Sequence, residues 1–170
     1  MGERGRFAAV VLPLVLALGC LVMATTAAGR SGGSKVRTSS SVEESIRDCA
    51  NRQRQARGMR HLEHDRALDR AARLHARRML AKGFFEHEDP SGDGPADRVK
   101  RFAKRRYVIV GENIAAGYES AGAACRGWMD SPGHRANILR SSFTRVGGGY
   151  ASGSKGYGRY YVQVFADVAG

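Results

Sequence analysis

The sequence lacks the motifs of several large functional classes. It has no internal repeat, which excludes a solenoid. The glycines at 147–149 are followed by neither a Lys-Ser/Thr pair nor a helical pattern, so they do not form a phosphate-binding loop. His61 and His64 are three residues apart, whereas a zinc-protease helix has two histidines four residues apart with a glutamate beside the first. We therefore interpret both as surface histidines.

Acidic charge is scarce in this chain. Its 170 residues contain 16 Asp and Glu against 28 Lys and Arg, which gives a formal charge of +12. Such a surface favours anionic partners, for example anionic lipids or acidic wall polymers, and the alternative is a solvated surface with no specific ligand. Nucleic-acid binding is not favoured, because no recognition motif is present and the aromatic residues are not interleaved with the basic runs. The densest basic run, which we interpret as a solvated face, contains Arg98, Lys100, Arg101, Lys104, Arg105 and Arg106.

An apolar run follows the positively charged start of the chain and covers residues 7–23. Small residues at plausible cleavage positions come after it. This pattern predicts an export signal over residues 1–28, and hence a secreted or extracytoplasmic protein. Two alternatives stay open at this point, namely a retained N-terminal membrane anchor and lipid attachment at Cys20.

The rest of the chain divides into a linker and one domain. Residues 29–40 consist mainly of Gly, Ser and basic residues, which predicts a flexible linker. Residues 41–170 are long enough for a single domain with a hydrophobic core. Residues 1–28 carry two arginines and one glutamate, so the exported part has a charge of +11.

Cysteine is also scarce, which leaves few possible pairings. Once Cys20 leaves with the export signal, Cys49 and Cys125 remain, and an exported protein reaches an oxidising environment. We therefore predict a disulfide between Cys49 and Cys125, with a long closed loop worth roughly 3–5 kcal/mol in the chain-entropy model. The alternative is a Cys125 nucleophile served by His134, but the neighbours typical of catalytic cysteines are absent.

The order of the predicted elements indicates an α+β fold. Apolar residues recur at helical spacing in the first part of the chain, and β-prone residues alternate near its end. Helices first and a hairpin last favour helices packed on an antiparallel sheet. Helices are predicted to begin at Ser41, Asp65, Pro95 and Glu119, with a further turn at 135–139, and strands are predicted at 107–110, 146–150 and 159–165.

Three polar residues that are far apart in sequence form the candidate site. His87 lies between two phenylalanines and a turn-rich segment, Glu112 follows an apolar stretch, and His134 lies in a turn after a helix. We expect Glu112 to be buried, and a buried carboxylate needs a cation, a metal ion or several N–H donors. His75 lies on an apolar helical stripe and is predicted to be a core imidazole with a hydrogen-bond partner.

Several of these motifs together resemble the CAP superfamily, which includes cysteine-rich secretory, antigen-five and pathogenesis-related proteins, and they are most similar to its compact bacterial members. The resemblance covers roughly residues 42–167. It implies an α-β-α sandwich with a cavity lined by two His and two Glu. The matching segments are Asn51 with Arg54, Leu68, Ala71 and Ala72, His87, Gly111–Ile114, and Trp128 followed by 131–139.

The resemblance assigns His87, Glu112 and His134 to three of the four cavity positions. The fourth position, typically Glu, is Ser131 here, and the nearest carboxylate belongs to Asp130. In this family the four residues have been linked to divalent cations, so a Zn²⁺ ion held by His87, Glu112 and His134 is one expectation.

Two functions follow from these expectations. The preferred one is a non-enzymatic, monomeric extracellular module that binds lipid, wall polymer or a host molecule. The other is a metal-dependent hydrolase, for example a peptidase, whose metal ion activates water. Without a metal ion, the same residues would form a structural cluster of hydrogen-bonded polar groups.

Overall fold

The computed structural model describes residues 39–168. The segment predicted to be an export signal, with Cys20, lies outside these residues. Within the described part, no helix is both long enough and apolar enough to cross a membrane. In chain order the elements are α1 (Ser39–Gln55), β1 (Glu63–His64), α2 (Arg66–Lys82), α3 (Pro95–Lys100), β2 (Tyr107–Ala116), α4 (Ala121–Asp130), α5 (Pro132–Ile138), β3 (Arg145–Ser152) and β4 (Arg159–Val168).

The four strands form one sheet in the order β1-β3-β4-β2. β4 pairs antiparallel with β3 and with β2, which confirms the predicted hairpin. β1 has only two residues and joins the edge of β3 in parallel, a pairing that the sequence pattern did not predict. β2 is longer than predicted, because the strand continues through Gly111–Asn113 as far as Ala116.

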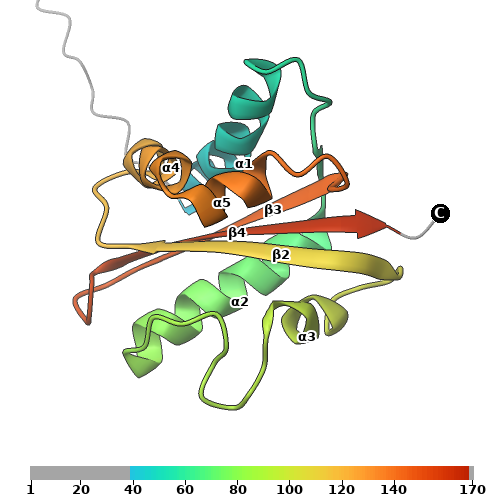
Figure 1. Ribbon diagram of the computed structural model, residues 1–170. Helices are drawn as coiled ribbons and strands as arrows, with labels where there is room; N and C mark the ends of the chain where they lie inside the picture. Colours follow the sequence, from blue (N-terminus) through green and yellow to red (C-terminus); the bar gives the residue numbers. More distant parts are fainter. Residues whose placement is uncertain (1–38, 169–170) are drawn as a thin grey trace, which may run out of the picture. The chain divides into compact units, whose positions relative to one another are not determined.

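Helices cover both faces of this sheet, as Figure 1 shows. α1, α4 and α5 lie on one face, and α2 and α3 lie on the other. Successive strand residues point to opposite faces, so the neighbours Val164 and Phe165 of β4 enter two different cores. The α-β-α sandwich expected from the resemblance is therefore confirmed.

Three glycines in β3 allow both helical layers to approach the sheet closely. A Cβ atom placed at Gly147 or Gly149 would lie 2.3 or 2.2 Å from the backbone of α2, and one at Gly148 would lie 2.5 Å from the backbone of α1. Real Cβ atoms do not come so near to backbone atoms, so only glycine fits at these three positions. The glycine run thus sets the spacing of the layers.

The helix ends follow the predicted signals in α2 but not in α1. Asp65 caps α2, since its carboxylate accepts a hydrogen bond from the N–H of Ala67. Gly83 ends the same helix with a left-handed φ of 71°. α1 begins at Ser39, so Ser41 lies in its first turn and the capping position predicted there is wrong.

A disulfide connects two helices of one layer. Cys49 of α1 is bonded to Cys125 of α4 across 76 residues of sequence, with their Cα atoms 5.9 Å apart. The predicted pairing is confirmed. Both cysteines are buried in the core that contains Trp128. In this bonded form Cys125 has no free thiol to act as a nucleophile.

Candidate functional site

The candidate site is built on the middle of β2, where a glycine and two polar residues interrupt the apolar pattern. Gly111 leaves room for the ring of Phe143, which lies 2.7 Å from the place where a Cβ atom would be. The side chain of Glu112 is only 1% exposed. Its carboxylate therefore depends on contacts within the protein in place of water.

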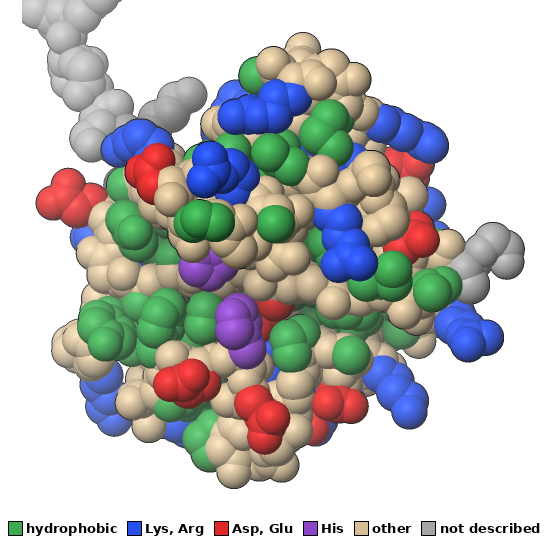
Figure 2. Space-filling model, in the orientation of Figure 1, with side chains coloured by type: hydrophobic (Ala, Val, Ile, Leu, Met, Phe, Trp, Pro, Cys, Tyr) green, Lys and Arg blue, Asp and Glu red, His purple; other side chains and the backbone are tan. Residues whose placement is uncertain are grey.

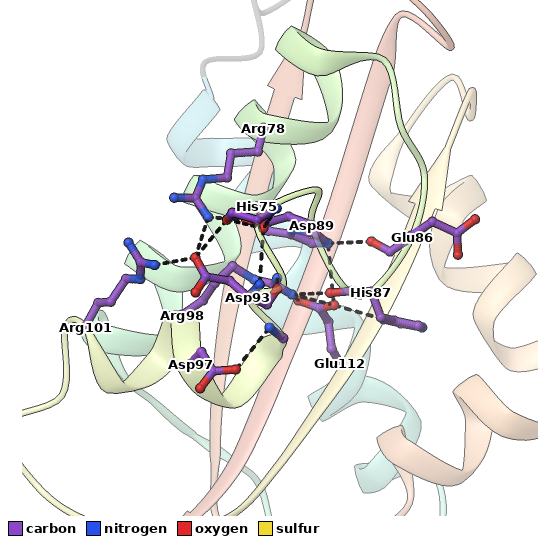
Figure 3. A network of polar contacts seen from close by, with 12 residues as sticks. His75, Arg78, Glu86, His87, Asp89, Asp93, Asp97, Arg98, Arg101 and Glu112 are labelled. Atoms are coloured by element: carbon purple, nitrogen blue, oxygen red, sulfur yellow. Dashed lines mark hydrogen bonds and ion pairs between the residues drawn. The ribbon is translucent and has the colours of Figure 1, made fainter.

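Arg98 and His87 supply those contacts (Figure 3). Nη2 of Arg98 lies 3.1 Å from Oε1 and 2.9 Å from Oε2 of Glu112. Nδ1 of His87 lies 2.9 Å from Oε1. An ionised carboxylate only accepts hydrogen bonds, so Nδ1 of His87 is the donor in this contact. Both oxygens of Glu112 are thus occupied.

Arg98 is the site residue that sequence reasoning assigned to the wrong environment. It was placed with the solvated basic run, but its side chain is 0% exposed in the interior. Besides Glu112, it donates to the carbonyl oxygens of Asp93 at 2.6 Å and His87 at 2.8 Å. A buried charge with several well-placed acceptors is stabilised where an isolated one would not be. Arg98 is therefore the cation that the buried Glu112 requires.

His75 of α2 closes the network from below the sheet. Its Nε2 lies 2.9 Å from the carbonyl oxygen of Glu86 and 3.7 Å from Oε1 of Glu112. Burial lowers the pKa of His75, and the nearby charge of Arg98 lowers it further, against the opposing effect of Glu112. The imidazole is therefore neutral at neutral pH, and its contact with Glu112 is not an ion pair. The prediction of a core histidine with a hydrogen-bond partner is confirmed.

The loop that carries His87 is held in place by Asp89. The side chain of this buried aspartate accepts hydrogen bonds from the backbone N–H groups of Ser91 and Asp93 and from Arg78 of α2. Burial raises the pKa of Asp89, but the hydrogen bonds from Ser91, Asp93 and Arg78 outweigh it and hold the pKa well below its usual range. The loop therefore has a charged anchor that fixes His87 over β2.

His134 reaches the same region from the other helical layer. Asn113 donates to the carbonyl oxygen of His134 at 3.1 Å, and Asn137 donates to the carbonyl oxygen of Glu112 at 3.1 Å. These amide contacts dock α5 on β2 beside the buried carboxylate. Burial and the nearby His87 lower the pKa of His134, so the two imidazoles are near enough to repel each other when charged. His134 lies within α5 and not in the turn predicted before it.

Within residues 39–168, no carboxylate other than that of Glu112 forms a hydrogen bond or ion pair with the side chain of His87 or His134. Ser131 ends α4 and begins α5, as a half-buried residue that cannot take up a proton at neutral pH. Asp130 and Glu88 are both exposed and form no ion pair within the part of the chain that the structure describes. Asp89 is committed to its own loop. The site therefore offers two imidazoles and one arginine-paired carboxylate.

The outer surface of this region is mixed in character. Figure 2 shows histidine side chains near the middle of one face, with hydrophobic side chains beside them. Lys and Arg side chains gather above the histidines and acidic side chains below them in this view. The side chain of His87 is 51% exposed, so its ring can meet a ligand from solution, whereas Glu112 cannot.

The sequence model of the cysteine-rich secretory protein family, CAP, matches residues 47–165. The chain belongs to this family. YkwD, an uncharacterized protein of Bacillus subtilis (strain 168), is 38% identical over 116 residues, which are 68% of this chain and 45% of YkwD. The uncharacterized membrane protein YlbC of the same organism is 32% identical over 77% of this chain and 35% of YlbC. The CAP chain described here thus spans less than half the length of both relatives.

Solved structures agree with this assignment. An extracellular protein from Bacillus anthracis str. Ames that contains an SCP domain is 31% identical, with a TM-score of 0.68 over 76% of this chain and 41% of that one. An outer surface protein from Borrelia burgdorferi shares the fold, with a TM-score of 0.67 at 19% identity over 74% of this chain and 92% of that one. The resemblance inferred from the motifs is confirmed at the level of family and fold.

The residues of this CAP domain fit a metal ion poorly. Residues 39–168 include no group of three or more His, Cys, Asp or Glu side chains placed to hold one. Of the predicted ligands His87, Glu112 and His134, the carboxylate already has partners on both oxygens. The Arg98 cation would also repel an ion bound beside it. The metal set stays a prediction from the motifs, and we derive no chemical step through it.

Proposed function

We propose that this chain is an exported CAP domain that binds an anionic polymer of the cell wall and performs no hydrolysis. The observation that carries the proposal is the state of Glu112, which is buried and paired with Arg98. A carboxylate paired in this way offers neither a base nor a free ligand position, and removal of its partner would leave an unpaired buried charge. The position of the second family glutamate is Ser131, which supports the same conclusion.

Three features support a location outside the cytoplasm. The first is the export signal predicted over residues 1–28. The second is the disulfide between Cys49 and Cys125, since structural disulfides persist in oxidising compartments. The third is the B. anthracis protein, which is described as extracellular and is 31% identical to this chain.

The charge of the chain favours an anionic ligand over a neutral one. Without residues 1–28, which contribute two arginines and one glutamate to the total of +12, the remaining charge is +11. A surface of this charge attracts polyanions and anionic lipids. Of these two we prefer a wall polymer, because it presents many charges along one chain and its binding does not require apolar side chains to insert into a membrane. Lipid and host molecules are the other ligands that the test must separate.

A sedimentation assay tests the proposal. The purified protein is mixed with isolated bacterial cell walls, and separately with phosphatidylglycerol and phosphatidylcholine vesicles, at increasing salt. We expect it to sediment with the walls at low salt and to be released as salt screens the charges, within about 0.5 M, where the Debye length is only a few ångströms. Failure to sediment with walls, or sedimentation with phosphatidylglycerol vesicles alone, contradicts the proposal.

The metal-dependent hydrolase is the alternative that the geometry does not favour. Calorimetric titration of the metal-free protein with Zn²⁺ tests it, beside the variants His87→Ala and His134→Ala and the surface control His61→Ala. We expect no tight Zn²⁺ binding, because the carboxylate of Glu112 is already paired with Arg98. Tight binding that is lost in the first two variants and kept in the control, with turnover abolished by a chelator, would establish the alternative.

A further inference from the structure

A basic cleft of about 500 Å³ lies at the N-terminal end of α2. Figure 1 shows the start of α2, the loop between α3 and β2, and the start of β3 meeting at one end of the sheet. None of His87, Glu112 and His134 lines this cleft. Its cationic side chains are Arg66, Arg70, Lys104, Arg105 and Arg145.

Most of these cations have no anionic partner among the described residues. Arg145 is paired with Glu63, whereas the other four form no ion pair with any residue of 39–168. The carboxylate in the lining, Asp65, is occupied by the N–H of Ala67 and the O–H of Tyr107. The cleft therefore has an excess of positive charge that the domain itself does not neutralise.

Two of the cations lie where they reduce the stability of the free protein. Arg66 and Arg70 are in the first turns of α2, near the helix end whose dipole repels cations. They are also four residues apart, the spacing at which like charges on a helix repel. Residues that break a local stability rule without an evident compensating contact are typical of functional sites. An anion in the cleft would attract both arginines and the helix N-terminus and so offset both repulsions.

Arg145 adds a donor without an acceptor. Its Nε is buried and has no hydrogen-bond partner among the described residues, although Nη1 is paired with Glu63. Buried donors in native proteins are nearly always satisfied. Nε of Arg98 is unsatisfied in the same way but does not line the cleft, so the cleft assignment rests on the unpaired cations and not on this atom.

A second hollow adjoins the cleft. It is more apolar, has a volume of about 400 Å³, shares Arg105 and Tyr107 with the cleft and is also lined by Lys100 and Arg106. Sites for drug-sized ligands span roughly 300–1,000 Å³, so each hollow has room for a ligand larger than one inorganic phosphate. Cations spaced along two contiguous hollows fit an extended ligand with several anionic groups.

We propose that the basic cleft binds a chain molecule that carries repeated phosphate groups. Four of its five cationic residues are arginines, whose planar guanidinium groups bind phosphate oxygens through paired hydrogen bonds. The proposal rests on the proposed function, because it names the surface through which an anionic wall polymer is held. It leaves His87 and His134 free for another contact.

Calorimetry with a soluble glycerol phosphate oligomer tests the cleft directly. The test variant is Arg66→Gln/Arg70→Gln, and the control is Arg126→Gln/Lys155→Gln, which removes the same charge from exposed sites on α4 and on the β3–β4 turn. We expect affinity to fall about tenfold or more in the test variant and less than about twofold in the control. Urea midpoints check that both variants are folded, and the test variant should be no less stable because it loses two repulsions.

Four outcomes would overturn the cleft assignment. Equal losses in both variants would mean that only the overall charge matters. Inorganic phosphate bound as tightly as the oligomer would mean that a single phosphate suffices. Binding to phosphatidylglycerol vesicles without binding to the oligomer would assign the surface to lipid. If walls are bound but the oligomer is not, the cleft assignment fails while the proposed function stands. If the oligomer is bound but walls are not, the proposed function fails while the cleft still binds a polyphosphate chain.

Discussion

The side chain with the most constrained environment in this domain is Glu112. Its two oxygens contact Arg98 and His87, and its side chain is only 1% exposed to solution. A buried ion pair of this kind is weak evidence for overall stability, but removal of one partner leaves an unpaired charge in the interior. The pair therefore makes Arg98 as necessary to the fold as any apolar core residue.

Arg98→Met is expected to lower the free energy of unfolding by about 3–5 kcal/mol, because Glu112 would stay buried without its cation. Urea denaturation followed by circular dichroism measures this loss. The matched control is Arg101→Met, since Arg101 pairs with Asp93 but is 48% exposed, and a loss of at most about 1 kcal/mol is expected there. The double variant Arg98→Met/Glu112→Gln should recover part of the loss. Similar losses for Arg98→Met and Arg101→Met would show that the buried pair has no special role.

At this scale the sequence predicted most of the site but not its cation. His87, Glu112 and His134 were identifiable because specific motifs surround them, and His75 because it interrupts an apolar stripe. Arg98 was hidden in a run of basic residues, where a solvated face is the usual outcome. One signal was present, because Arg98 precedes Phe102 by four residues and so lies on the same side of the helix. Charge alone cannot show which member of a basic run turns inward.

At the scale of elements, tight packing and one covalent bond hold the layers. The glycines of β3 bring α1 and α2 against the sheet, and the disulfide joins α1 to α4. The strands and the disulfide partners could be predicted from residue type and spacing. The packing role of 147–149 could not, because the close approach of two helices depends on the tertiary arrangement. The parallel pairing of β1 escaped prediction for the same reason, since two residues carry no periodicity.

Reduction of the Cys49–Cys125 disulfide is expected to destabilise the domain by roughly 4 kcal/mol, the chain-entropy value for a closed loop of this length. Urea denaturation with and without reductant measures the difference. The variant Cys49→Ala/Cys125→Ala is the control and should unfold at the same urea concentration in both conditions. A wild-type midpoint that does not change under reductant, with both thiols shown to be free, would contradict a stabilising role for the bond.

At the scale of the whole molecule, the buried His75 and the half-buried His134 and Tyr107 limit the pH range of stability. Burial lowers the pKa values of His75 and His134 below 6.5, so between those values and 6.5 the unfolded chain binds more protons than the folded one. Stability is then complete above about pH 6.5 and falls as the pH decreases. Burial and the hydrogen bond to Asp65 raise the pKa of Tyr107 to about 12, so stability also falls as the pH rises from 10 towards 12.

Urea denaturation at pH values from 5 to 8 tests the acidic limb of this prediction. The free energy of unfolding should decrease from pH 7 to pH 5, and the decrease should be smaller in His75→Gln, whose amide can still donate to the carbonyl oxygen of Glu86. The exposed His61 supplies the control, because His61→Gln should leave the slope unchanged. The slope is the decisive quantity, since it reports proton uptake and not the packing lost by the substitution. An unchanged slope in His75→Gln would mean that His75 binds protons equally in the folded and unfolded chain, which contradicts a pKa lowered by burial, and a larger decrease would mean that its imidazole is protonated in the folded state.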